Sequence, residues 1–128
     1  MKENEVSIVI NKPIGEVFEF TTNPKNTHRW VPSITEEVAD EYPPKAGTIY
    51  KNRRENGEWS VYRVVEFTPS RSFVMSEGDG NFSVQYTYKE IDENTTELTF
   101  LGWVKEGELT KTFSDTVLQG LKEIMEKG

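Results

Sequence analysis

The feature that most constrains this sequence is a series of turn signals between residues 33 and 104, which separate short segments rich in β-branched and aromatic residues. Proline, glycine, asparagine and aspartate favour chain reversals, and Asn-Gly in particular is typical of a two-residue type I′ hairpin loop. The signals are Pro43-Pro44 to Gly47, Asn56-Gly57, Pro69-Ser70, Asp79-Gly80 and Asp92-Glu93-Asn94. Because consecutive hairpins pair neighbouring strands in opposite directions, the pattern predicts an antiparallel meander of six strands.

The N-terminal segment carries a different set of signals. Residues 5–10 alternate β-branched apolar side chains with others, which predicts a strand covered on one face. Pro13 suits the first turn of a helix, and Asn23-Pro24 repeats the pattern of a cap followed by proline. We therefore expect two short helices, of which the second ends near Trp30, just before the next proline.

The C-terminal segment, from about Thr110 to Lys127, has the periodicity of an amphipathic helix. Its large apolar residues recur at intervals of three and four positions: Phe113, Val117, Leu121 and Ile124. This spacing predicts a long helix with one apolar face. Gly120 lies inside it, where glycine costs up to about 1 kcal/mol relative to alanine, and we expect close packing against the sheet to compensate.

Composition excludes several functional classes. The chain has 128 residues, the size of one domain, and 15 Lys and Arg against 22 Asp and Glu give a net charge of −7. An acidic surface repels phosphate backbones, so we expect no nucleic-acid partner. No apolar run approaches the roughly 20 residues that cross a bilayer, so we expect no membrane span. The lack of cysteine and of an apolar N-terminal stretch favours a cytoplasmic protein.

The sequence also offers few ligands for a metal or a cofactor. There is no cysteine, and His28 is the single histidine, whereas a zinc site needs several converging ligands. The segment Gly78-Asp79-Gly80 is predicted to be a hairpin turn flanked by acids rather than a phosphate-binding loop. We therefore expect no metal site and no cofactor, and no catalytic triad around His28.

Three short sequence motifs resemble those of one known family. They are Ile10-x-x-Pro13-x-x-x-Val17-Phe18, then Asn23-Pro24-x-Asn26-x-x-x-Trp30-x-Pro32, and Val65-Glu66-Phe67-Thr68-Pro69 with Arg71 two residues later. Together with the order of the predicted elements, they resemble the polyketide cyclase/dehydratase branch of the START-like superfamily, also called SRPBCC. The resemblance covers nearly the whole chain and implies one α+β domain over residues 1–128 with the helix-grip fold. In that fold a curved seven-stranded antiparallel sheet surrounds a long C-terminal helix, and two short helices follow the first strand.

The resemblance also implies a function. Members of this superfamily often hold hydrophobic molecules, so we expect an apolar ligand (a lipid, an aromatic or a polyketide-like molecule) in a cavity between the sheet and the C-terminal helix. The residues expected to line it are Tyr50, Trp59, Arg63, Phe73, Met75, Phe82, Tyr86, Phe100, Gly102, Phe113, Val117 and Leu121. Two registers of the fourth strand remain open, because the competing register turns Tyr62 and Val64 inward and leaves Arg63 in water.

Two alternatives to simple binding remain open. A cyclase or dehydratase would need a positioned acid or base, for which Glu77, Arg63, Tyr86 and Tyr50 are the candidates, but the sequence singles out no catalytic residue. A co-chaperone-like interaction module, a second use of this fold, would depend on an exposed apolar patch rather than on a cavity. Among these possibilities we expect a binding protein rather than an enzyme, as a monomer or a weak homodimer.

Overall fold

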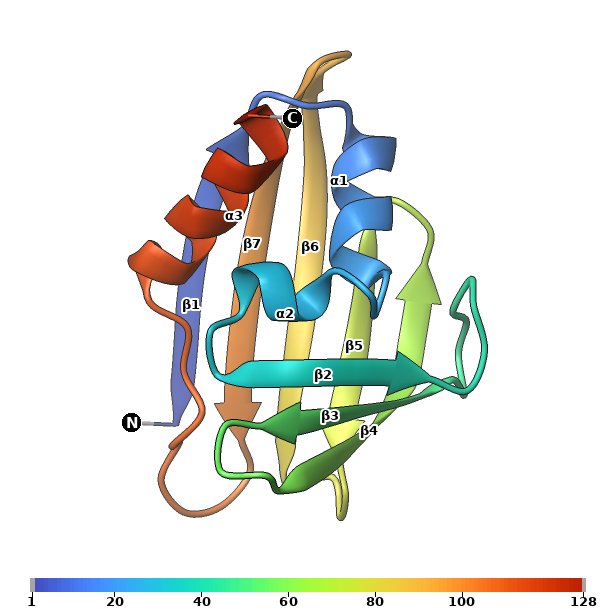
Figure 1. The fold of residues 1–128 in the computed structure, drawn as a ribbon, viewed down its shortest axis with the longest axis vertical. Coiled ribbons are helices and arrows are strands. Elements are labelled where there is room, and N and C mark those ends of the chain that lie inside the picture. Colours follow the sequence, from blue (N-terminus) through green and yellow to red (C-terminus); the bar gives the residue numbers. More distant parts are fainter. Residues whose placement is uncertain (1, 128) are drawn as a thin grey trace.

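The computed structural model describes residues 2–127, which form a seven-stranded antiparallel sheet with three helices (Figure 1). The strands are ordered β1-β7-β6-β5-β4-β3-β2, so β1 joins the end of the meander and each later pair is a hairpin. In chain order the elements are β1 (Glu3–Ile10), α1 (Ile14–Thr22), α2 (Thr27–Trp30), β2 (Ile34–Ala39), β3 (Ile49–Arg54), β4 (Trp59–Thr68), β5 (Ser72–Glu77), β6 (Phe82–Asp92), β7 (Thr95–Val104) and α3 (Asp115–Lys127). The helix-grip fold predicted from the sequence is confirmed.

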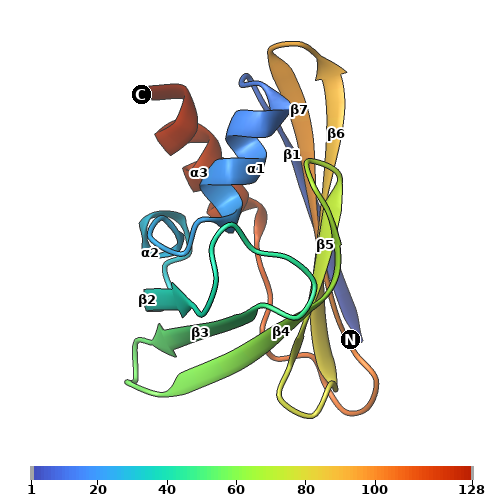
Figure 2. The same ribbon diagram turned by 90° about the vertical axis from the view of Figure 1, so that its right-hand side faces the viewer.

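The sheet is curled rather than flat. Figure 2 shows β1, β7, β6 and β5 upright, with β4, β3 and β2 bending across toward the side that carries all three helices. The register shifts between Val64 and Glu66 on β4, close to this bend, and between Ile34 and Glu36 on β2. Such bulges increase the local twist of a strand. The curled strands and the helices therefore enclose the concave face of the sheet from two sides.

The C-terminal helix is shorter than predicted. α3 begins at Asp115 and not near Thr110, and Phe113 belongs to an irregular segment in front of it. The backbone N–H of Phe113 donates a hydrogen bond of 2.8 Å to Asn4 Oδ1 of β1, and its ring stacks on Phe100 of β7 at 4.0 Å between centroids. These contacts hold residues 111–113 against the sheet instead of in a helical turn.

α3 itself packs beside β1 and buries Leu118, Leu121 and Met125. Its Lys122 Nζ donates to the carbonyl oxygen of Val9 at 2.7 Å, which fixes the helix to the end of β1. The expected close packing at Gly120 is wrong, because a Cβ added there would meet nothing within 4 Å. Gly120 faces open space, so packing does not require it.

The Asn56-Gly57 hairpin is present, but its type differs from the prediction. Gly57 has φ of +88°, while Asn56 is not among the described residues with positive φ, so a type I′ turn is excluded. Gly57 N–H donates to Arg54 O and Arg54 N–H donates to Glu58 O, both at 2.8 Å. These bonds close a three-residue loop in which only the glycine needs the left-handed conformation.

Candidate functional site

A small cavity lies between the concave face of the sheet, α2 and residues 111–113. Its volume is about 80 Å³, and it reaches the surface where the exposed Thr112 and the half-buried Ser33 line it. The strands that contribute to it are β2 to β7, and the helical contribution comes from α1 and α2. The site therefore lies under α2 and the segment before α3, not under α3.

Aromatic rings form a large part of the cavity wall. Phe73 of β5 and Tyr86 of β6 are a directly paired cross-strand couple, and their rings stack at 4.8 Å with an interplanar angle of 5°. Trp30 of α2 meets Tyr86 edge-on at 6.3 Å and Phe113 edge-on at 5.7 Å. Paired rings in these arrangements add roughly 0.5–1.5 kcal/mol each beyond their burial, so the wall is a stable surface even though the space beside it is unfilled.

One end of the cavity is polar. Glu37 on β2 stands opposite Asn52 on β3, and Thr27 at the start of α2 completes what we call the polar cluster: Thr27, Glu37 and Asn52. Thr27 Oγ1 donates to Glu37 Oε1 at 2.5 Å, and Asn52 Nδ2 donates to Glu37 Oε2 at 3.4 Å. Burial raises the pKa of the Glu37 carboxyl from 4.5 to about 7, although both hydrogen bonds act to lower it. Glu37 therefore changes charge near neutral pH.

Two buried polar atoms beside this cluster have no hydrogen-bond partner within residues 2–127. They are Trp30 Nε1 and Asn52 Oδ1, in side chains that are each 4% exposed and that both line the cavity. An unpaired buried donor or acceptor costs about 1–3 kcal/mol, so such atoms are rare in packed cores, and a bound water, ion or ligand is the usual explanation. By contrast, Tyr50 donates to Thr22 O at 2.7 Å and is satisfied within the protein.

An ion pair stands where the cavity approaches solvent. Lys111 Nζ lies 2.6 Å from both carboxylate oxygens of Glu77, and it also lies over the rings of Tyr62 and Phe82, at 5.8 and 5.6 Å from their centroids. Glu77 is thus a half-buried partner of Lys111. As a group held by a cation, it is a weaker candidate for proton transfer than Glu37.

The structure brings together most of the residues that the sequence assigned to the cavity. Those that line it are Tyr50, Phe73, Met75, Phe82, Tyr86, Phe100 and Phe113. Burial raises the pKa of Tyr86 well above its usual value, so this hydroxyl stays neutral. For Phe73, Met75, Phe82, Tyr86 and Phe100, alternation along β5, β6 and β7 was sufficient to predict the concave face, because the pairing of these strands has no register shift over these residues.

The other assigned residues lie elsewhere, and each has a physical reason. Trp59 and Arg63 are exposed on the convex face, because the register of β4 turns Tyr62 and Val64 inward. Gly102 is buried, but the space above it is occupied: an added Cβ would lie 3.3 Å from Phe100 and 3.6 Å from Phe82.

Two assigned residues of α3 also lie outside the cavity. Leu121 is fully buried in the main core. Val117 lines a shallow groove between α2 and α3, together with Gly120 and Ile124. Both miss the cavity because α3 packs beside β1, at the other end of the sheet from the curled strands β2 to β4.

Sequence reasoning missed the polar cluster and the indole of Trp30 as a donor. The inward position of Asn52 could have been predicted, since Tyr50 and Asn52 are two residues apart on one strand and must share a face. Glu37 carried no such signal, because β2 has two adjacent glutamates and no clear apolar alternation. Its inward orientation follows from the pairing with β3, which only the folded structure fixes.

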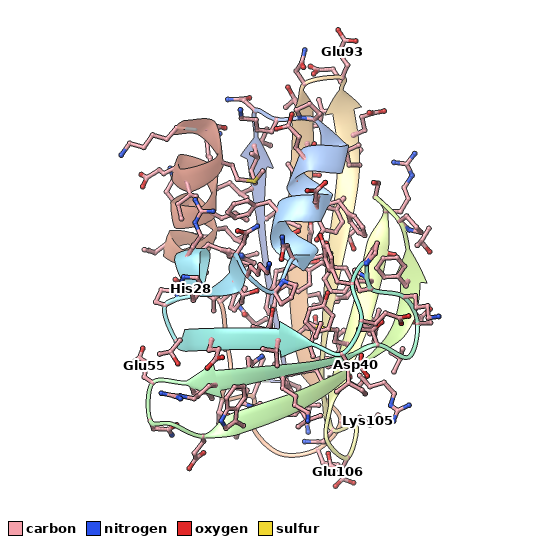
Figure 3. The ribbon with its side chains drawn as sticks, turned by 45° about the vertical axis from the view of Figure 1, so that its right-hand side comes forward. His28, Asp40, Glu55, Glu93, Lys105 and Glu106 are labelled. Atoms are coloured by element: carbon pink, nitrogen blue, oxygen red, sulfur yellow. The ribbon has the colours of Figure 1, made fainter. Side chains whose placement is uncertain are left out.

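Several other ionisable residues lie outside the cavity. His28 is exposed on α2, and the acids Glu55, Glu93 and Glu106 lie at hairpin tips and in the loop after β7 (Figure 3). Within residues 2–127 there is no group of three or more histidine, cysteine or acidic side chains able to hold a metal ion. No helix in the same range is long and apolar enough to cross a membrane.

Comparisons with known proteins agree with this architecture. A family model described as "Polyketide cyclase / dehydrase and lipid transport" matches residues 1–128. No curated protein matches the chain significantly.

Similar solved structures include the Aha1 dimer from Colwellia psychrerythraea, with a TM-score of 0.70 and 15% identity over 98% of this chain and 97% of that one. A polyketide-cyclase-like protein from Corynebacterium glutamicum has a TM-score of 0.60 and 27% identity, covering 80% of this chain and 65% of the other. The di-domain ARO/CYC BexL from the BE-7585A biosynthetic pathway has a TM-score of 0.66 and 15% identity, over 81% of this chain and only 36% of its own length. At 15% identity, the likeness to the first and third of these shows the fold alone.

Proposed function

Because the chain belongs to the polyketide cyclase / dehydrase and lipid transport family, we propose that it binds a small, largely apolar molecule in the cavity beneath α2. The observation that carries the proposal is an unfilled volume of about 80 Å³ bounded by stacked aromatic rings and open toward solvent at one end. Protein cores are ordinarily packed as densely as organic crystals, and apolar concavities with a few polar groups are the usual form of ligand sites.

The size of the cavity limits its ligand. An engineered apolar cavity of about 150 Å³ holds benzene, whereas drug-sized ligands occupy about 300–1,000 Å³. At about 80 Å³ the cavity is about half that size, so a molecule of one ring enters only if the wall moves, and a lipid chain or a fused polyketide would need far more room. This narrows the range of ligands expected from the sequence.

A matched pair of substitutions tests the proposal. Val84 of β6 lines the cavity, whereas Val64 of β4 is 1% exposed in the solid part of the core. Val84→Phe fills the cavity, so we expect it to abolish binding of toluene and to leave the denaturation midpoint close to that of the wild type. Val64→Phe overpacks the core and should cost about 1–3 kcal/mol.

The readout is the melting temperature at increasing toluene concentration, which rises when a ligand binds only the folded state. If toluene fails to stabilise the wild type and Val84→Phe is as damaging as Val64→Phe, the cavity is not a binding site. The co-chaperone-like interaction module would then be the better hypothesis.

Glu37 supports an enzymatic alternative. A carboxyl with a pKa of about 7 inside an aromatic cavity is suited to take and return a proton, as a cyclase or dehydrase reaction requires. If Glu37 acts in this way, the protein should accelerate hydrogen–deuterium exchange at the methyl group of acetophenone, which lies next to the carbonyl. When exchange is followed by NMR, the acceleration should be absent with Glu37→Gln. A rate with wild-type protein equal to the rate without protein would exclude this role.

A further inference from the structure

The unpaired polar atoms assign a chemical class to the ligand. Resting on the function proposed above, we infer that the cavity takes a neutral aromatic molecule with one hydroxyl group, a phenol, and that Trp30 and Asn52 bind this hydroxyl. The aromatic wall receives the ring, and the polar end receives the oxygen.

Trp30 supplies a donor in a fixed position. Its indole is 4% exposed and is held by edge-on contacts with Tyr86 and Phe113, so the ring cannot turn its N–H toward water without breaking them. An indole N–H only donates, and Nε1 has no acceptor among the described residues. A ligand that brings an acceptor to this point would pair this donor.

Asn52 supplies the complementary group. Its amide nitrogen Nδ2 donates a hydrogen bond of 3.4 Å to Glu37 Oε2, whereas its amide oxygen Oδ1 has no partner within residues 2–127. Whichever end of an amide faces its partner, the opposite end stays available. A hydroxyl oxygen donates one hydrogen bond and accepts others, which is the combination that Trp30 and Asn52 leave open.

Other ligand classes fit less well. A hydrocarbon leaves both buried atoms unpaired. An ammonium group has no lone pair for Trp30 Nε1. A carboxylate would place a second acid beside Glu37, whose own ionisation is already disfavoured by burial.

Two cationic groups also line the cavity, Lys111 and Arg54. Lys111 is neutralised by Glu77 at 2.6 Å near the opening. Arg54 lines the cavity at the next inward position of β3 after Asn52 and is the last residue of that strand. A free carboxylate ligand is nonetheless included in the test because of Arg54.

The test compares p-cresol, toluene and 4-methylbenzoate, which differ in one substituent on the same ring. Isothermal titration calorimetry at pH 7 should give p-cresol an affinity at least about tenfold higher than toluene, because two buried polar atoms gain partners only with the hydroxyl. Equal affinity for p-cresol and toluene would overturn the inference while leaving the proposed function intact. Tighter binding of 4-methylbenzoate would overturn it in favour of an anionic ligand, and binding of none of the three would overturn both proposals.

Substitutions locate the effect. Asn52→Leu removes the amide at similar volume, and Trp30→Phe keeps an aromatic ring but removes the N–H. Each should lower the affinity for p-cresol by about threefold to tenfold more than the affinity for toluene, which measures any change in the apolar wall. Gln85→Leu makes a similar exchange on the convex face of β6 and should change neither affinity. If p-cresol retains its advantage in both cavity variants, the hydroxyl is bound elsewhere and the inference fails.

Discussion

Glu37 should make the stability of the folded protein depend on pH in a direction opposite to that of most carboxylates. Its pKa is raised from 4.5 to about 7, with burial as the first cause, so the folded state favours the protonated form. The stabilising effect of that proton is fully present below pH 4.5, where both states bind it. It is lost progressively as the pH rises through 7, where the unfolded chain is ionised and the folded chain must ionise a buried group. Since a tenfold change in proton affinity is 1.36 kcal/mol, the difference between 4.5 and about 7 amounts to about 3 kcal/mol.

Glu37→Gln removes the charge at nearly the same shape, and Gln can still accept the hydrogen bond from Thr27. We expect the free energy of unfolding of Glu37→Gln, relative to the wild type, to rise by about 3 kcal/mol between pH 4.5 and pH 8.5. Urea denaturation at several pH values measures this, and subtraction of the two curves cancels every other titrating group.

Glu36→Gln is the matched control, since Glu36 is the exposed neighbour on the same strand, and no such rise is expected for it. If the curves of wild type and Glu37→Gln run parallel over this range, Glu37 does not carry a buried proton and its assignment to the polar end of the cavity is refuted.

Three further predictions concern the framework. Gly57→Val should destabilise the protein by about 1 kcal/mol or more, because valine is strained at φ of +88°, and an unchanged urea midpoint would contradict the three-residue hairpin loop. Gly120→Ala should instead stabilise by about 0.5–1 kcal/mol, since the added methyl meets no neighbour within 4 Å and alanine favours the helix; a loss of stability would show a contact that the structure lacks. EDTA should leave the melting temperature unchanged, and a shift of several degrees would reveal an all-oxygen metal site.

The fold was predictable because its signals are local. The turn residues at Asn56-Gly57 and Pro69-Ser70 mark real reversals, and the alternation Leu98, Phe100, Val104 gives the inward face of β7. Local signals define strand ends and faces, and short hairpins then leave one way to order the sheet.

The site was predictable only in part, because it depends on registers and on a helix start that no local pattern fixes. Arg63 and Tyr62 are adjacent on β4, and a shift of one position exchanges them between water and core. Phe113 fits a helical period with Val117, yet its hydrogen bond to Asn4, far away in the sequence, holds it outside the helix. Glu37 is the site residue that the sequence indicates least. It is an acid in an acid-rich strand, and nothing in that pattern shows that pairing with β3 will turn it inward.

A methyl-resolved NMR titration with p-cresol tests the central claim most directly. The methyl groups of Met75 and Val84 line the cavity, those of Val64 lie in solid core, and those of Val117 and Ile124 line the separate groove between α2 and α3. We predict that the resonances of Met75 and Val84 move together and saturate at one equivalent per chain, while Val64, Val117 and Ile124 stay in place. Shifts confined to Val117 and Ile124, or no shifts at saturating p-cresol, would contradict the assignment of the cavity beneath α2 as the binding site.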